Sequence, residues 1–213
     1  MVRLFPLIFV FLWSSAFISS KIIVDDASPF ASLGFRFAIV ALGFYLFSII
    51  RRERFSGTRA DILSACATGV LFHGLYLGGV FFAISKGLPA GIAALIVSLQ
   101  PVLTGALAGP ILNEVVTWRQ WAGICLGFAG AALVLGFDIG GSLPVIGVVA
   151  SIIALAAVTI GTLWQKKVSG KLPLSVSNCY QAVGAAVFHC VVMLLLEEPF
   201  INLTASFSLS MGW

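Results

Sequence analysis

Charged residues in this chain fall in short clusters, and long apolar stretches separate the clusters. A helix of about 20 apolar residues crosses the roughly 30 Å hydrocarbon core of a bilayer. Only 9% of the 213 residues are charged and 60% are hydrophobic, which leaves too little charge to cover a soluble domain. The sequence therefore predicts an all-α, polytopic membrane helix bundle.

Seven membrane spans are expected, at residues 4–20, 30–50, 62–84, 90–112, 118–137, 144–165 and 176–196. With the N-terminus placed inside, the inner side carries nine basic residues: Arg3, Arg51, Arg52, Arg54, Arg59, Arg119, Lys166, Lys167 and Lys171. The outer side carries two, Lys21 and Lys86. This bias follows the positive-inside rule. We therefore expect a multi-pass protein of the cell membrane with a cytoplasmic N-terminus, and the net charge of +4 requires no nucleic-acid partner.

The first and sixth spans match at a fixed offset of 144 residues, which pairs Pro29 with Pro173. This offset covers five spans, an odd number, so the second copy would enter the bilayer from the opposite side. The charges agree, because the acidic loop at 25–26 corresponds to the basic loop at 166–171. Inverted repeats of this kind are typical of transporters, which bind their solute near the midplane between the copies.

The repeat predicts two structural units. Residues 1–140 would form a first five-helix repeat, and residues 141–213 an incomplete second repeat that lacks its last three spans. We expect the chain to be a C-terminally truncated transporter. The alternative is a native seven-span protein in which the proline match is coincidental.

Three segments carry a family resemblance. Residues 87–135, GLPAGIAALIVSLQPVLTGALAGPILNEVVTWRQWAGICLGFAGAALVL, are the most specific of them. FLWSSAFISSKIIV in the first span and GFRFAIVAL in the second are the others. In these segments the chain resembles the drug/metabolite transporter superfamily, and specifically its EamA-type ten-helix carriers. The resemblance implies ten spans in two inverted five-helix repeats, cytoplasmic termini, and export or uptake of small metabolites.

Polar and aromatic side chains inside the spans are the candidates for a solute site, because polar groups are costly in hydrocarbon without a partner or water. The candidates are Trp13, Ser15, Ser19, Lys21, Arg36, His73, Tyr76, Ser98, Gln100, Pro101, Thr104 and Thr159. Ser15 and Ser19 lie four residues apart on one helical face, and the repeat pairs Ser15 with Thr159. Interhelical hydrogen bonding is the alternative role for the serines. Lys21 either attracts a carboxylate or snorkels to the interface.

Two roles are open for Arg36, the one charged residue well inside a span. A pair with Asp25 or Asp26 would make it structural, and a wet cavity would make it a substrate or gating group. His73 and Tyr76 share one face of the third span. Proton coupling through His73 and a packing hydrogen bond are the two interpretations of that histidine.

The fourth span contains a helix-breaking signal. Pro101 cannot donate to the carbonyl of Val97, so we expect a strained helix beside Ser98, with Gln100 and Thr104 nearby. Transporters place their solutes at such breaks. The alternative is a structural kink in which serine or threonine satisfies the freed carbonyl.

Smaller motifs predict packing rather than chemistry. The pairs Gly74–Gly78 and Gly123–Gly127 have the Gly-x-x-x-Gly spacing that lets membrane helices approach closely. Thr117 and Gln120 have the spacing of a capping box that opens the fifth span.

The function that these features favour is a secondary carrier for small metabolites, amino acids or drugs, working by alternating access. Its partners would be a small-molecule substrate and the lipid bilayer, with a homodimer left open. No cofactor or metal is expected, and no enzyme, because the zinc-protease and nucleophile-elbow motifs are absent from the sequence. A retinal receptor would need a lysine in residues 176–196, which contain none. A non-transporting membrane fragment, or a receptor or assembly protein, is the remaining alternative.

Overall fold

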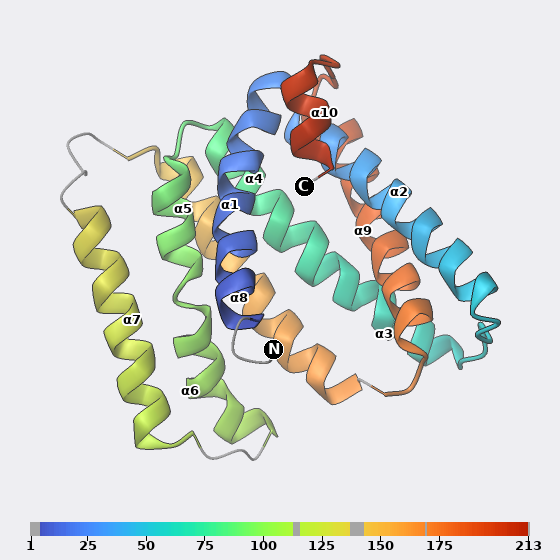
Figure 1. Ribbon diagram of the computed structural model, residues 1–213, viewed down its shortest axis with the longest axis horizontal. Helices are drawn as coiled ribbons and strands as arrows, with labels where there is room; N and C mark the ends of the chain where they lie inside the picture. Colours follow the sequence, from blue (N-terminus) through green and yellow to red (C-terminus); the bar gives the residue numbers. More distant parts are fainter. Residues whose placement is uncertain (1–4, 113–115, 137–142, 169, 213) are drawn as a thin grey trace.

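The computed structural model describes residues 5–112, 116–136, 143–168 and 170–212. Its elements are α1 (Phe5–Asp26), α2 (Pro29–Ile50), α3 (Arg59–Gly69), the π-helix η2 (Val70–Leu77), α4 (Gly78–Ser85), α5 (Ala90–Val97), α6 (Gln100–Leu112), α7 (Trp118–Gly136), α8 (Val145–Val168), α9 (Leu174–Leu196) and α10 (Ala205–Met211). Figure 1 shows them as one helical bundle. The expected all-α, polytopic architecture is confirmed.

Each predicted span falls on a helix or a run of helices. Five helical stretches of the described residues are long and apolar enough to cross a membrane: 29–50, 59–85, 90–109, 145–168 and 174–196. Helices α1 and α7 occupy the other two predicted spans. Large apolar side chains point outward, with Ile50 78% and Leu126 76% exposed. Such surfaces suit a hydrocarbon solvent rather than water.

Two elements differ from the expectation. Helix α1 continues to Asp26 instead of ending at residue 20, because no helix-breaking residue occurs before Ser28 and Pro29. Helix α10 was not expected as a separate element. Its N-cap is Thr204, whose hydroxyl accepts the backbone N–H of Phe207 at 3.0 Å.

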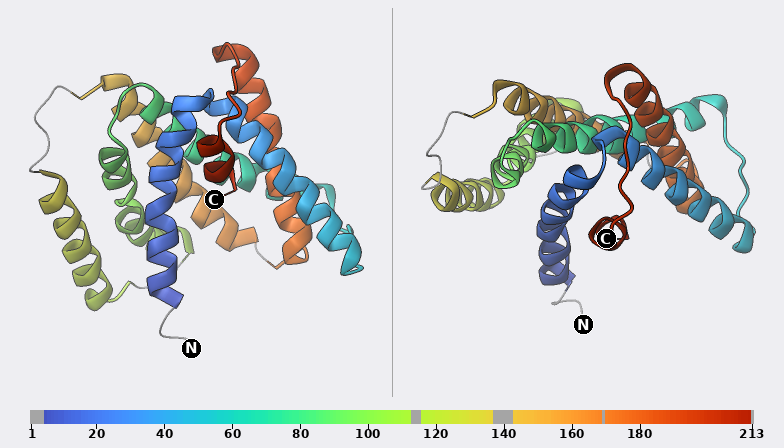
Figure 2. Two further views of the ribbon diagram at one scale, coloured as in Figure 1. Left: turned by 45° about the horizontal axis from the view of Figure 1, so that its top comes forward. Right: turned by 90° about the horizontal axis from the view of Figure 1, so that it is seen from above.

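The helices are arranged in a curved row with two helices on one side of it. Helix α2 packs along α9, α9 also packs on α3, and α8 packs on η2 and α4. Seen from above, α1 and α10 lie on the same side of this row (Figure 2), and they contact each other. Helices α1 and α10 therefore lie together beside one face of the row.

Glycines set the closest helix approaches. A Cβ on Gly69 of α3 would lie 1.9 Å from the carbonyl oxygen of Gln181 in α9. Cβ atoms on Gly74 and Gly78 would lie 2.8 and 2.9 Å from the rings of Phe188 and Phe30, so the predicted packing role of this pair is confirmed.

The second predicted glycine pair, Gly123 and Gly127, does not mediate a close helix contact among the described residues. A Cβ on Gly123 or Gly127 of α7 would meet no atom within 4 Å in the part of the chain that the structure describes. Both residues line a hollow instead of a helix contact. The predicted capping box before α7 is confirmed, since Gln120 accepts the backbone N–H of Thr117 at 2.8 Å and the Thr117 hydroxyl accepts that of Gln120 at 3.4 Å.

The N-terminus of α2 receives a cap from a distant part of the chain. The Glu197 carboxylate, just after α9, accepts the backbone N–H groups of Phe30 at 3.1 Å and Ala31 at 3.3 Å. A carboxylate at this position also complements the helix dipole. Burial raises the pKa of Glu197 above its ordinary value, and the two backbone hydrogen bonds oppose that rise.

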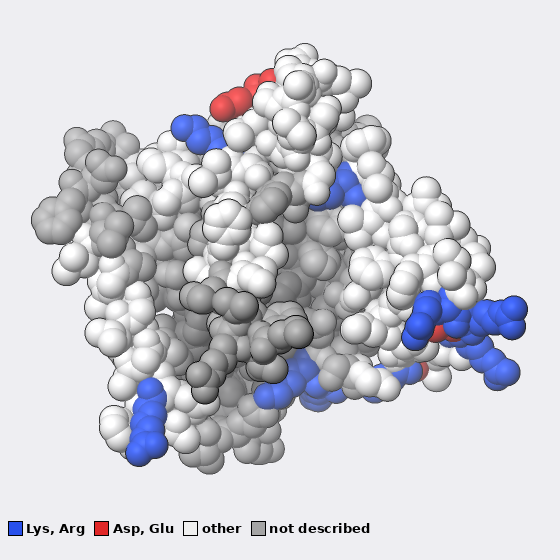
Figure 3. All heavy atoms as spheres, in the orientation of Figure 1, with Lys and Arg blue, Asp and Glu red and all other residues white. Residues whose placement is uncertain are grey.

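Charged side chains gather at the two ends of the bundle. In Figure 3 most visible lysines and arginines lie toward the lower, basic end of the molecule, and acidic side chains appear at the opposite end and also within the basic cluster on the right. At the basic end, Asp61 of α3 pairs with Lys171 at 3.5 Å. The apolar middle of the molecule lies between these ends, as a bilayer requires.

Candidate functional site

A cavity of about 300 Å³ lies between α1, α2 and the η2–α4 stretch. Its polar groups come from three elements: Ser20 of α1, Arg36 of α2, and His73 and Tyr76 of η2. The rest of the lining is apolar and largely aromatic, and includes Phe17, Phe72 and Phe81. A few convergent polar groups in an aromatic chamber are typical of a small-molecule site.

Arg36 of α2 is hydrogen-bonded to α10. Its Nη2 donates to the carbonyl of Ser210 at 3.0 Å and to that of Met211 at 3.4 Å. Asp25 and Asp26 were the expected partners, but the described residues show no ion pair of Arg36 with either. Asp26 accepts instead from the hydroxyls of Thr204 at 2.6 Å and Ser206 at 3.1 Å. Arg36 therefore ties the last turn of α10 to α2. Its half-buried guanidinium also lines the cavity.

The π-helix η2 presents His73 and Tyr76 to the cavity. The ring of His73 packs on Phe37 of α2 with 4.9 Å between the ring centroids. Tyr76 is 5% exposed and belongs to the core that α4, α5 and α8 share. Short π-helical segments occur frequently at functional sites. The predicted common face of His73 and Tyr76 is therefore the face that lines the cavity.

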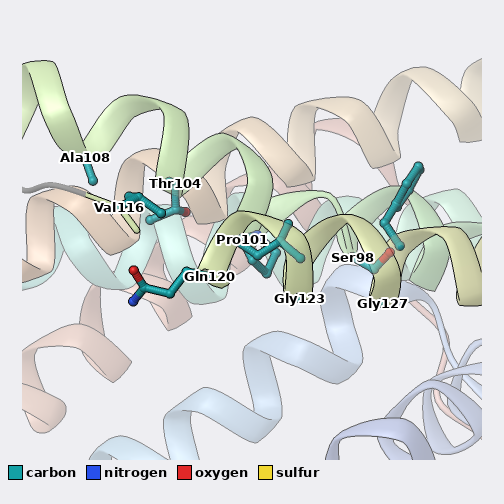
Figure 4. A pocket seen from close by; sticks show the side chains of 11 residues that line it. Ser98, Pro101, Thr104, Ala108, Val116, Gln120, Gly123 and Gly127 are labelled. Atoms are coloured by element: carbon teal, nitrogen blue, oxygen red, sulfur yellow. The ribbon is translucent and has the colours of Figure 1, made fainter. Parts of the chain in front are cut away.

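A second hollow, of about 590 Å³, lies between the α5–α6 stretch and α7. Figure 4 shows Ser98, Pro101 and Thr104 on one side of it and Gly123 and Gly127 on the other. This hollow is larger, yet its lining carries no ionisable side chain among the described residues. We regard the smaller cavity as the better candidate, because it combines a cation, an imidazole and a phenol.

The helix break predicted at Pro101 is present. Helix α5 ends at Val97 and α6 begins at Gln100. The Ser98 hydroxyl donates to the carbonyl of Leu95 at 2.6 Å, which satisfies one of the carbonyls that the break leaves without an α-helical partner. The sequence interpretation of a strained helix is thus correct in position.

Five of the remaining candidates line neither hollow. Ser15 donates to the carbonyl of Phe11 at 2.7 Å, and the buried Thr159 donates to that of Leu155 at 2.8 Å, each within its own helix. The Gln100 amide donates to Thr162 of α8 at 3.0 Å. Two more α1 residues line neither hollow: Ser19 is half-buried and Lys21 is exposed. Trp13 lies in α1, but its side chain is outside the described part of the structure.

Sequence reasoning missed several parts of this site. Ser19 was predicted as a site residue and Ser20 was not, but of these two serines only Ser20 lines the cavity. The helical extension of α1 to Asp26 places Ser20 within the helix rather than at its end. The aromatic walls Phe17 and Phe72 carry no signal that separates them from other apolar residues of the spans.

Comparison with known proteins identifies the family. A model of the EamA-like transporter family matches residues 2–136, more than half of the chain. The chain belongs to the EamA-like transporter family. It is a multi-pass membrane protein of the drug/metabolite transporter superfamily, as its helices and its sequence motifs also indicate.

Several curated EamA-like relatives are named as transporters. The chain is 26% identical to the uncharacterized transporter YvbV of Bacillus subtilis, over 96% of this chain and 70% of that protein. It is 31% identical to an S-adenosylmethionine/S-adenosylhomocysteine transporter of Chlamydia muridarum, over 60% of this chain and 40% of that protein. It is 24% identical to a probable amino-acid metabolite efflux pump of Salmonella typhimurium, over 78% of this chain and 54% of that protein. The chain thus spans between two fifths and seven tenths of the length of these relatives.

Proposed function

We propose that this protein is a secondary transporter that moves small metabolites, amino acids or drugs across the cytoplasmic membrane by alternating access. The observation that carries the proposal is the cavity of about 300 Å³ in which Arg36, His73 and Tyr76 meet an aromatic lining. Its volume lies at the lower end of the range for ligand sites. The names of two relatives, an S-adenosylmethionine/S-adenosylhomocysteine transporter and a probable amino-acid metabolite efflux pump, support small polar metabolites as the solutes.

Each polar side chain has a chemical task in this proposal. The Arg36 guanidinium pairs with an anionic group of the solute, and the Tyr76 hydroxyl and His73 imidazole hydrogen-bond to its polar atoms. Phe17 and Phe72 pack against the apolar part of the solute. Specificity then depends on whether a solute leaves these buried polar groups paired.

The inverted repeat supplies the motion. Residues 1–140 and 141–213 correspond in this proposal, which makes α2 and α9 equivalent helices. The fold supports this pairing, because α2 and α9 begin at Pro29 and directly after Pro173, and they pack along each other. Rocking of the two repeats would open the cavity to either side. The N-terminus and the basic loops face the cytoplasm in this arrangement.

Flux through proteoliposomes tests the proposal. The probes are tritiated S-adenosylmethionine and a ¹⁴C-labelled amino-acid mixture. We expect accumulation of at least one probe. We expect Tyr76→Phe to raise the KM for that probe by up to about tenfold, because the variant loses one hydrogen bond to the solute. Thr104→Val, which likewise removes one hydroxyl but from the hollow beside α7, is the matched control and should leave flux unchanged.

Two results would contradict the assignment. A folded protein that carries neither probe would refute transport of these solute classes. Loss of flux in Thr104→Val with normal flux in Tyr76→Phe would move the solute site to the α6–α7 hollow.

A further inference from the structure

His189 of α9 is fully buried and makes one specific polar contact across the bundle. Its exposure is 0%, and its Nε2 lies 2.9 Å from the backbone carbonyl oxygen of His73 in η2. A carbonyl can only accept, so Nε2 must carry the proton. The Nδ1 atom has no hydrogen-bond partner among the described residues. This arrangement fits a neutral imidazole with one donor, and that donor is committed to His73.

The surroundings hold the imidazole in place. A Cβ on Gly78 would come within 3.1 Å of the His189 Cε1 atom, and a Cβ on Gly34 within 3.6 Å of the His189 Cβ atom. The rings of Phe30 and Phe37 lie 5.8 and 5.7 Å away, the latter nearly parallel to the imidazole. Two glycines thus leave the space for the imidazole, and two aromatic rings fix its orientation.

The acceptor of this hydrogen bond lies in the unusual part of the helix. Residues Val70–Leu77 form π-helical turns, which are wider than α-helical turns and pair each carbonyl with the fifth residue onward. A carbonyl that is poorly paired at membrane depth costs several kcal/mol. A side-chain donor aimed at the His73 carbonyl therefore favours the π-helical arrangement over a regular α-helix.

We propose that His189 is a positioning residue, which stabilises the π-helical turn of η2 and thereby keeps His73 and Tyr76 turned into the solute cavity. This inference rests on the transport function proposed above. Residues one position apart in an α-helix differ by about 100° in direction. Helix α3 is fixed against α9 at Gly69. A return of η2 to the α-helical register would rotate the part that follows, and Tyr76 would leave the cavity.

Isotope-edited infrared spectroscopy tests the contact directly, because the chain contains only two histidines. In His189→Leu and in His189→Gln, [1-¹³C]histidine labels the His73 carbonyl alone. Glutamine places an amide donor where Nε2 lies, and leucine removes the donor. We expect the labelled amide band of His189→Leu to shift to higher wavenumber than that of His189→Gln. Identical bands in the two variants would overturn the proposal.

The same two variants also test whether the hydrogen bond affects transport. With the probe that the protein transports, we expect His189→Leu to raise the KM several-fold and His189→Gln to restore it, with Cys190→Ala unchanged as the neighbouring control. Equal KM values in the leucine and glutamine variants would contradict the positioning role. A third outcome separates the two proposals. If the infrared bands of the two variants differ but neither the unaltered protein nor any variant transports a probe, the hydrogen bond between His189 and His73 is supported and the proposed transport function is refuted.

The unaltered protein offers a test that needs no substitution. ¹⁵N solid-state NMR of histidine-labelled protein should show a neutral His189 ring protonated at Nε2. A ring protonated at Nδ1 would overturn the proposal even if His189→Leu failed to fold.

Discussion

At the scale of single residues, glycine decides how closely the helices of this bundle approach. Gly69 and Gly184 bring α3 and α9 into backbone contact, and Cβ atoms there would lie 1.9 Å from the Gln181 carbonyl and 2.5 Å from the Cys66 carbonyl. Association of membrane helices depends on such close packing, because lipid tails remove the hydrophobic difference between inside and outside. The two glycines are therefore part of what fixes η2, which follows α3 directly.

Gly69→Ala tests this contact. The new methyl group would force α3 away from the backbone of α9, and overpacking of this kind lowers the free energy of unfolding by about 1–3 kcal/mol. We expect a lower thermal midpoint in detergent. Gly43→Ala in α2 is the control, because a Cβ there meets no described atom within 4 Å and alanine is the better helix former. Equal midpoints for the two variants would show that α3 and α9 do not touch at Gly69.

At the scale of elements, the sequence predicts helices well and their connections poorly. Apolar runs place the spans, and Pro101 correctly marks the break between α5 and α6. The Glu197 cap on α2 could not be predicted, because its partners Phe30 and Ala31 lie more than 160 residues away. The π-helical register of η2 was also missed, since no single residue type marks it and the donor comes from α9.

The Glu197 cap has a pH signature. Burial raises the pKa of this carboxyl above its ordinary 4.5, so the folded state binds the proton more tightly than the unfolded state. The stability from this group is fully present below pH 4.5 and is lost as the pH rises through the raised pKa. In the unaltered protein we expect the thermal midpoint to fall between pH 4 and pH 8 as Glu197 loses its proton. In Glu197→Gln this contribution to the fall should be absent. Parallel pH profiles would mean that Glu197 titrates normally.

At the scale of the whole molecule, the candidate site is assembled from segments that the sequence keeps apart. Arg36, His73 and Tyr76 were predicted as candidates, and the fold places them around one cavity. Ser98, Pro101 and Thr104 were expected at the same site but line a separate hollow, because α6 diverges from the row toward α7. Periodicity gives the face of each helix, and only the packing of helices tells which faces meet.

The proposed alternating-access mechanism makes one demand on this cavity: water must reach it from each side of the membrane in turn. Ala16 and Ile18 of α1 are both exposed, Ile18 to 66%, but only Ala16 lines the cavity. A cysteine at either position can be alkylated by a membrane-impermeant maleimide and located by mass spectrometry, which separates it from the four native cysteines.

The labelling of Ala16→Cys in sealed, oriented proteoliposomes is the most direct test of the cavity as a solute pathway. We expect labelling of Ala16→Cys from both sides, less labelling in the presence of a transported solute, and little labelling of Ile18→Cys from either side. Flux that persists while Ala16→Cys is protected on both sides would contradict the account, because solute would then cross the membrane by another route.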